Sequence, residues 1–419
     1  MVSVATEAFA PLARIEMKAW GWEVPLARIQ HPLGGIPLDQ VASRADAVVE
    51  FFLAQTTGEG ATAAVEVPQI PQDPMLRAPA DVVAFLDFVA ARGLGDGLPV
   101  VPPTPARVEA MLRSCGADPE QVVGRFPPRR LLATVRDVAV NAVLAGCPEP
   151  GFPVVLAALR AALAEEFNLL GVLATTHPCG ITVIVSGPAA RSLGLNSGLS
   201  LYGPGSRLNA GIGRAVRLAL QNLGGAWPGS VDKSTQGSPA KYTYCFAENL
   251  EASPWGPYHV ERGFDASATT VTVASGEGPH NVHDPASRTA ESLLRYLCTS
   301  MAHSGHNGIY HKGDLFLVLC PEHAELLASA GYDRRRIREH IFETARVPGK
   351  NLGRDCYEHF TGRWPEDEPR PADMETSLLA LTRGPDQIHV LVAGGAGKHS
   401  SWIPTFGLSY SATVPLERR

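Results

Sequence analysis

Residues of the types that carry out chemistry gather in three loops between residues 175 and 255. The loops are TTHPCG (175–180), YGPGSRLNAGIGR (202–214) and STQGSPAKYTYCFAENLEASPW (234–255). They contain more Gly, Pro, His, Arg, Lys, Asn and Glu than a scaffold needs, and each adjoins an apolar run that can anchor it. Because catalytic residues often lie on loops of a rigid α/β frame, we place the active site here.

The first loop places a histidine and a thiol just before the apolar run 181–186. The Thr-Thr-His-Pro setting of His177 is too polar for a core position, so we predict an acid–base role for His177. A Cys and a His activate each other only within hydrogen-bond reach. Cys179 is therefore interpreted as a small packed thiol.

The second loop runs directly into an apolar-periodic helix and carries Arg207, Asn209 and Arg214. Backbone N–H groups of a Gly-rich turn at a helix start, with arginines nearby, can bind an anion or a carboxylate. The glycine spacing does not match the dinucleotide-binding fingerprint. The alternative is an ordinary tight turn with helix capping.

The third loop packs Lys241, Cys245 and Glu248 among aromatic residues. Burial can lower the pKa of a lysine or raise that of a glutamate into the range useful for acid–base catalysis. We therefore predict catalytic roles for these residues, with Cys245 as the best internal thiol and Trp255 as a pocket wall. The alternative is an internal Lys–Glu ion pair that orders the loop.

The segment GGAGKHS (394–400) follows an apolar strand and resembles a phosphate-binding loop only superficially. His399 stands where that motif requires Ser or Thr, and the leading glycine is missing at Val392. What remains is a strand-end nest in which Lys398 and His399 can hold an anionic group. We expect this segment and the three loops to converge on one cavity.

Two further segments, 276–284 and 303–311, are rich in histidine. Their spacings could bind zinc or another transition metal, although nothing places them on one helix. Surface or hydrogen-bonded histidines are the favoured interpretation, and His280 is the best metal-ligand candidate because it follows a strand. A transition metal is thus one candidate cofactor, and no other is indicated. The histidines are His280, His283, His303, His306 and His311.

Alternating strand and helix patterns predict an α/β fold with one main mixed or parallel sheet flanked by helices. We divide the chain into an incomplete β-α-β-α fragment (1–55), a Gly- and Pro-rich linker (56–79) and a main α/β domain (80–419) that carries the site loops. Predicted strands of the main domain are 171–174, 181–186, 269–274, 315–319 and 388–392. Its predicted helices are 80–92, 105–114, 135–145, 152–165, 212–222, 287–300, 321–330 and 335–345.

Composition excludes several classes of protein. A net charge of -6 with mixed signs gives no general attraction to nucleic acid or anionic lipid. The start of the chain lacks the order of a signal peptide, and no apolar stretch approaches the about 18 residues of a membrane span. We therefore expect a cytoplasmic protein. The 7 cysteines are scattered without a CxxC motif, so reduced thiols are expected.

Several motifs resemble a known family. VATEAFAPLAR (4–14) and HPLGG (31–35) resemble the C-terminal end of the UGSC-motif (seleno)protein family, whose members carry a selenocysteine- or cysteine-Gly-Ser-Cys sequence that is absent here. The rest is similar to the long protein that accompanies that family. The motifs of this second part are DGLPVVPPT (96–104), NAVLAGC (141–147), NSG (196–198), GPGSRLNAGIGRA (203–215), KYTYCFAEN (241–249), SPW (253–255), HVERG (259–263) and GGAGKHS (394–400).

The resemblance implies the fold, a partner subunit and thiol or selenol chemistry. Residues 1–55 then look like half a domain, and the missing half would contain the reactive cysteine. Two parallel strands leave sheet edges uncovered, so another polypeptide could complete this sheet. The alternative is a truncated remnant docked on the main domain.

These observations lead to one main hypothesis and two alternatives. The main hypothesis is an enzyme subunit that forms a composite site with a UGSC-motif partner, or a homo-oligomer, and acts on a small anionic substrate by thiol-dependent redox or transfer chemistry. The first alternative is a metal-dependent lyase or hydrolase built from His177, His280 and the 303–311 cluster. The second is a non-catalytic maturation or scaffold subunit.

Overall fold

Two four-stranded sheets pack face to face in the middle of the molecule. The computed structural model describes residues 2–33, 36–56, 75–362, 370–371 and 373–417. The first sheet has the strand order β14 (Ala412–Pro415), β7 (Thr270–Gly276), β5 (Gly180–Ser186) and β6 (Cys245–Ala247). The second has the order β12 (Ile388–Val392), β9 (Leu315–Leu319), β13 (His399–Pro404) and β8 (His280–His283).

Both sheets are mixed. Strand β5 runs parallel to β6 and antiparallel to β7, with Gly180 opposite Gly276. Strand β9 runs parallel to β12 and antiparallel to β13. A single bridge between Gly276 and Thr405 joins the two sheets. The end of β7 therefore lies beside the end of β13.

The apolar runs form strands because both faces of each sheet are covered. In β5, Val183 and Val185 face a core shared with helices, whereas Ile184 packs against Phe316 and Ile403 of the second sheet. Runs that are apolar at nearly every position are typical of strands buried on both faces. Alternate side chains thus supply two different cores from one strand.

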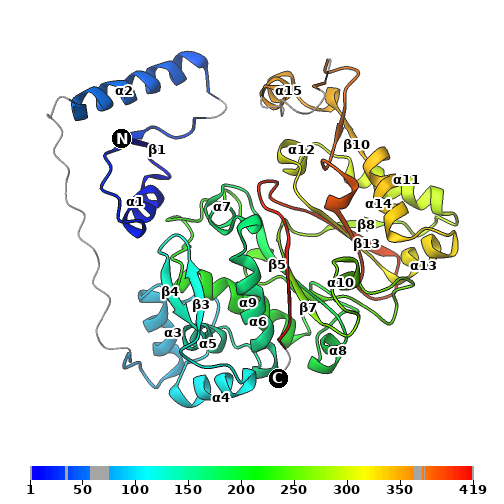
Figure 1. Ribbon diagram of the computed structural model, residues 1–419, viewed down its shortest axis with the longest axis horizontal. Coiled ribbons are helices and arrows are strands. Elements are labelled where there is room, and N and C mark those ends of the chain that lie inside the picture. Colours follow the sequence, from blue (N-terminus) through cyan, green and yellow to red (C-terminus); the bar gives the residue numbers. More distant parts are fainter. Residues whose placement is uncertain (1, 34–35, 57–74, 363–369, 372, 418–419) are drawn as a thin grey trace.

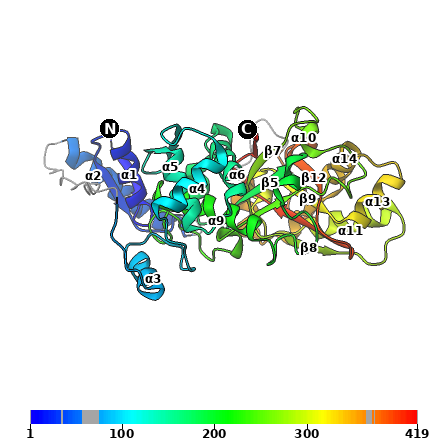
Figure 2. The ribbon, with the colours of Figure 1, turned by 90° about the horizontal axis from the view of Figure 1, so that it is seen from below.

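Helices cover the outer faces, so the layers are helix, sheet, sheet and helix (Figures 1 and 2). On the first sheet lie α6 (Phe152–Ala162) and α9 (Arg207–Asn222), and α4 (Pro105–Cys115) and α5 (Val135–Leu144) pack on these two helices. Helix α3 (Val82–Ala91) contributes Phe85 and Val89 to the same core. On the second lie α11 (Ala290–Met301), α13 (Pro321–Ser329) and α14 (Arg334–Thr344). The other elements of this body are β3 (Val122–Phe126), β4 (Leu131–Thr134), α7 (Leu169–Ala174), α8 (Ala189–Leu193), α10 (Tyr258–Glu261), α12 (Gly308–His311), β10 (Arg346–Pro348), α15 (Arg354–Thr361) and β11 (Leu378–Ala380).

The N-terminal unit lies to one side of this body (Figure 1). It consists of β1 (Ser3–Thr6), α1 (Ala10–Ala19), β2 (Leu26–Ile29) and α2 (Leu38–Thr56), and within the described residues its two parallel strands pair only with each other. Arg130 of the β3–β4 hairpin contacts it through Glu16 (3.1 Å) and the Trp20 ring.

The predicted α/β class is confirmed, but two expectations are corrected. The strands divide into two main sheets instead of one. Residues 171–174 belong to helix α7, because the Asn168 side chain caps a helical turn there. The expected linker falls largely on residues 57–74, outside the described residues. No helix in the described part of the chain is long and apolar enough to cross a membrane.

Candidate functional site

One carboxylate and four histidines meet where the two sheets join. His177 comes from the loop between α7 and β5, Glu277 comes from the turn between β7 and β8, and His280 is the first residue of β8. His303 and His306 come from the loop after α11. The antiparallel register of β5 and β7 places residues 177 and 277 at the same sheet end. We call these five residues the histidine cluster.

The central contact joins His177 and Glu277. His177 Nε2 lies 2.7 Å from Glu277 Oε1, and the side chains are only 9% and 14% exposed. A carboxylate at this distance fixes the proton on Nε2, so Nδ1 carries the lone pair of the neutral imidazole. His177 Nδ1 is buried, and none of the described residues forms a hydrogen bond with it. The ring of Phe406 stacks against His177, with centroids 5.8 Å apart.

Glu277 is held in its ionised form. Burial alone would raise its pKa, but the hydrogen bonds with His177 and His280 lower the pKa of Glu277 to about 2. The Asn307 N–H adds a longer contact of 3.3 Å to Oε1. The second oxygen, Oε2, lies 3.6 Å from His280 Nε2. One carboxylate therefore lies between two imidazoles.

The remaining histidines pack around Trp402 of β13. His280, His303 and His306 lie with ring centroids 4.8, 5.3 and 5.1 Å from Trp402. Burial lowers the pKa of His306 to about 3, with a smaller effect of His303, and burial beside His280 also lowers the pKa of His303. His280 is 35% exposed and opens the cluster to solvent.

The cluster is not arranged as a metal centre. Within the described residues, no group of three or more His, Cys, Asp or Glu side chains could hold a metal ion. His177 Nε2 already faces Glu277, and His306 Nδ1 accepts from the Gly308 N–H. An accepting Nδ1 puts the proton of neutral His306 on Nε2, where it blocks that nitrogen as a ligand. The geometry therefore gives no support to the predicted metal role of His280.

Cys245, the predicted internal thiol, lies in the helix-facing core of the first sheet. Burial raises the pKa of Cys245 well above its usual range, so the thiol stays protonated at neutral pH. Burial likewise raises the pKa of Cys179 to about 12. The expectation of a reactive Cys245 is corrected, whereas the packed thiol expected at Cys179 agrees with its burial.

Lys241 forms an ion pair with a residue that sequence reasoning missed. Its Nζ lies 2.9 Å from Asp232 Oδ2, which also accepts from Arg217 at 2.8 Å. Burial would raise the pKa of Asp232, but these two cations lower it. The alternative of an internal Lys–Glu ion pair is therefore corrected: Lys241 pairs with Asp232, and Glu248 pairs with Arg334.

Glu248 belongs to a fully buried polar network. Its Oε1 lies 2.7 Å from Arg334 Nη2, with side chains 0% and 1% exposed, and it also accepts from the Tyr258 N–H. Ser186 Oγ donates to Glu248 (2.5 Å) and lies 2.9 Å from His259 Nδ1. In a catalytic triad the histidine stands between acid and serine. Here the serine stands in the middle, so the predicted acid–base role of Glu248 is corrected to a structural one.

Most of the second loop forms the start of helix α9 and the residues that cap it. Helix α9 begins at Arg207, and the buried Asn209 binds backbone groups of Asn196. Arg214 forms a bidentate pair with Asp96 at 2.8 Å. Arg207 is exposed and donates to the Gly146 carbonyl (3.3 Å). Ser206 caps α9 by accepting from the Asn209 N–H, as the capping alternative expects, and Arg214 is committed to a structural ion pair.

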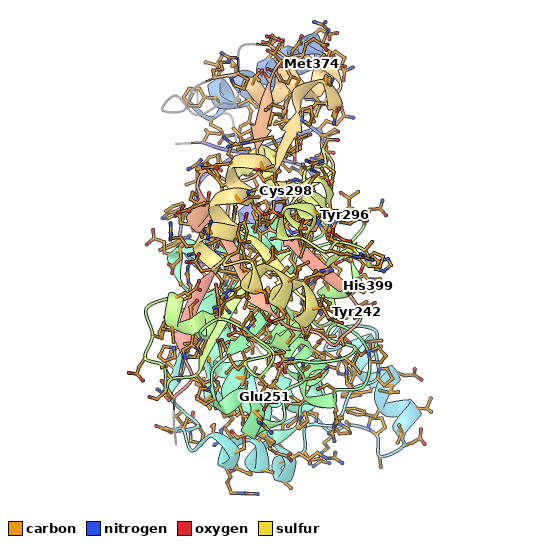
Figure 3. The ribbon with its side chains drawn as sticks, turned by 90° about the vertical axis from the view of Figure 1, so that its right-hand side faces the viewer. Tyr242, Glu251, Tyr296, Cys298, Met374 and His399 are labelled. Carbon is orange, nitrogen blue, oxygen red and sulfur yellow. The ribbon has the colours of Figure 1, made fainter. Side chains whose placement is uncertain are left out.

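The nest at 394–400 is filled by the protein itself. Glu322, in the first turn of α13, accepts from the Gly397 N–H at 2.7 Å. Lys398 donates to the Pro285 carbonyl (3.0 Å), and His399 stacks on His283 with centroids 4.1 Å apart. His399 lies at the rim of the molecule in Figure 3. An anionic ligand would have to displace the Glu322 carboxylate, which corrects the predicted anion-binding role of this segment.

The four loops do not all build one cavity. Cys179, Gly213 and Lys241, from three of the loops, line one small pocket of about 10 Å³, and no residue of 394–400 lines it. Loops 194–205, 248–252 and 393–399 do meet, through Asn249 N to the Val392 carbonyl and Gly394 N to the Ser197 carbonyl. His177 lies instead at the other end of β5, with the histidine cluster. Trp255 packs on the helix-facing core of the second sheet and donates to the Tyr332 carbonyl. It does not wall a pocket near His177.

A cavity of about 810 Å³ lies elsewhere, between α4, α8 and the C-terminal residues 416–417. Its lining is largely Ala, Pro, Leu and Ser, and it contains neither His nor Cys.

No known family model, curated protein or solved structure matches the chain. The chemistry of the histidine cluster is therefore the basis for a functional interpretation.

Proposed function

We propose that the chain is an enzyme subunit in which His177, oriented by Glu277, is the acid–base group. The observation that carries this proposal is the 2.7 Å contact between His177 Nε2 and Glu277 Oε1, together with the unpaired Nδ1. A carboxylate that fixes the tautomer leaves a lone pair for proton abstraction and stabilises the imidazolium that forms. Because the pKa of Glu277 is about 2, it stays ionised at neutral pH.

His280 supplies the second part of the proposed chemistry. A substrate that gives a proton to His177 becomes more negative, and the His280 ring next to Glu277 would stabilise that charge by donating a hydrogen bond. A small anionic substrate fits this role. Because Nδ1 is buried, the substrate must displace part of its cover, which includes Phe406.

The reacting thiol or selenol is proposed to come from a partner subunit of the UGSC-motif family. Cys147, Cys179, Cys245, Cys298 and Cys320 are all buried, and burial raises the pKa of each thiol. The N-terminal unit offers a surface for such a partner. Its two-stranded sheet has open edges, and Val49 and Phe52 of α2 are 55% and 45% exposed. Exposed apolar surface next to unpaired strands favours association.

The two alternatives receive less support. A metal-dependent lyase or hydrolase needs His177, His280 and the 303–311 segment together, and the structure does bring them together. His177 Nε2 nevertheless faces Glu277 and His306 Nδ1 accepts from the Gly308 N–H, and among the described residues no three side chains are placed to hold a metal ion. A non-catalytic scaffold would not require a carboxylate held between two imidazoles.

The test compares the His177→Gln variant with the wild type in complex with a UGSC-motif protein. Glutamine keeps a donor toward Glu277 but removes the base. Each complex is incubated with a small-molecule extract, and products are identified by mass spectrometry. We expect a product whose rate of formation falls about 100-fold or more in His177→Gln and is unchanged in the control His283→Gln.

Three outcomes would contradict parts of this proposal. Equal product formation by His177→Gln would remove the acid–base assignment. Loss of the product on addition of a chelator, with recovery by a metal ion, would favour the metal-dependent alternative. A stable complex that forms no product would favour the scaffold. The paired change Val49→Glu with Phe52→Glu should prevent assembly, and normal assembly would remove the proposed partner surface.

A further inference from the structure

A second cavity, of about 410 Å³, lies at the amino ends of the parallel strands β9 and β12. Its lining includes Arg262, Asp314, Asp386, His389, Tyr410 and Ser411. The volume lies within the range of small-molecule pockets, which is about 300–1,000 Å³. It shares no lining residue with the histidine cluster, so its interpretation does not depend on the proposed function.

The floor of this cavity is fixed by its own hydrogen bonds. Ser411 donates to Asp314 Oδ2 through its N–H (2.7 Å) and its Oγ (2.6 Å), and His389 Nε2 lies 3.3 Å from the same oxygen. The other ring nitrogen of His389 lies 3.2 Å from Tyr258 Oη. Because these groups satisfy one another, the floor is preorganised and leaves ligand recognition to the rim.

The rim carries three exposed charged residues, Arg262, Arg383 and Asp386, and of these Arg262 and Asp386 do not pair with each other. Arg262 follows α10, and Asp386 lies in the turn before β12. Both residues are exposed, and in the part of the chain that the structure describes neither side chain has a hydrogen bond or an ion pair with protein. A cation and an anion that face one cavity separately complement a ligand that carries both charges.

We propose that this cavity binds a small zwitterion of the α-amino-acid type. Its carboxylate would accept charge-assisted hydrogen bonds from Arg262, and its ammonium group would donate to Asp386. Tyr410 also lines the cavity, next to Ser411 of the floor. A simple anion such as phosphate would be attracted by Arg262 and Arg383 but would also face the Asp386 carboxylate. The presence of Asp386 beside Arg262 therefore favours the zwitterion over a simple anion.

The experiment screens the full chain for binding of the common α-amino acids by saturation-transfer NMR, and titrates each hit by calorimetry. Each hit is compared with its deaminated acid and its decarboxylated amine, and with inorganic phosphate. The variants are Arg262→Ala and Asp386→Asn, with Arg288→Ala and Asp87→Asn as exposed controls. Loss of one charge-assisted bond should weaken amino-acid binding about tenfold to a hundredfold.

The proposal requires a crossed pattern. Arg262→Ala should weaken the amino acid and the acid but not the amine, and Asp386→Asn should weaken the amino acid and the amine but not the acid. If Arg262→Ala melts early, Arg262→Gln replaces it. Absence of amino-acid binding up to about 10 mM, tighter binding of phosphate, or equal binding by all variants would overturn the proposal.

Discussion

Replacing Glu277 by Gln should destabilise the protein by an amount that depends on pH. In the folded protein the pKa of Glu277 is about 2, compared with the ordinary value of 4.5, because His177 and His280 contact its carboxylate. A difference of this size corresponds to about 3 kcal/mol of folding free energy when the carboxylate is ionised. Glutamine keeps the shape of the side chain but loses that charge.

The sign follows from the lowered pKa. A carboxyl group whose pKa is lower in the folded than in the unfolded state stabilises the fold fully above its unfolded pKa. That contribution disappears as the pH falls from about 4.5 toward 2. The difference in stability between wild type and Glu277→Gln should therefore be about 3 kcal/mol at pH 7 and should shrink steadily below pH 4.5.

The assay is urea unfolding of both proteins at a series of pH values between neutral and the lowest at which both still fold. Other acidic groups, such as Asp232 and Asp314, also lose ionisation in this range, but they do so in both proteins. Glu291→Gln, at an exposed position of α11, serves as the control. A difference between Glu277→Gln and wild type that stays constant over this range would refute the reasoning.

Three further predictions concern the residues that the structure assigns to packing. Thiol reagents should label the less buried Cys115 and Cys356 first and should label Cys245 only when the protein unfolds. Peptide mass spectrometry measures the order of labelling. Early labelling of Cys245 would contradict its burial. Arg334→Met should lower the free energy of unfolding by about 3–5 kcal/mol, because it leaves Glu248 as an unpaired buried charge. The control Arg335→Met breaks an exposed ion pair and should lower it by about 1 kcal/mol or less. Equal urea midpoints of the two variants would contradict this prediction. Gly213→Ala should lower the melting temperature, because the Cβ of the alanine would lie 2.5 Å from Tyr244 N. The helix propensity of alanine alone would raise it. An unchanged or higher melting temperature would therefore contradict the close contact.

Local sequence pattern was sufficient for most of the helices and for the apolar strands. Residues 181–186, 315–319 and 388–392 were predicted as strands, and these are β5, β9 and β12 within one residue. Their side chains are apolar at nearly every position, which a strand buried on both faces requires. Short strands were missed. β6 has three residues, and its parallel pairing with β5 is a long-range contact without a local signal.

The sequence also indicated the chemically important histidines but not their partner. His177 and His280 were singled out by their polar settings at strand ends, and Glu277 stood unnoticed in a Gly-rich turn three residues before His280. Its position after a predicted strand was the available signal. Only the register of β5 against β7, with Gly180 opposite Gly276, brings Glu277 to His177. That register depends on packing between segments about 100 residues apart, which local pattern does not encode.

Burial and ion pairing give the other predicted site residues structural roles. Lys241, Cys245 and Glu248 have residue types that suit catalysis, and their loop is rich in polar groups, so type and spacing alone favoured an active site. In the folded protein Lys241 forms an ion pair with Asp232, Cys245 packs in a hydrophobic core, and Glu248 forms an ion pair with Arg334. The sequence determined which residues could do chemistry, whereas the fold determined which of them face an open site, because burial and ion pairing arise from segments distant in the chain.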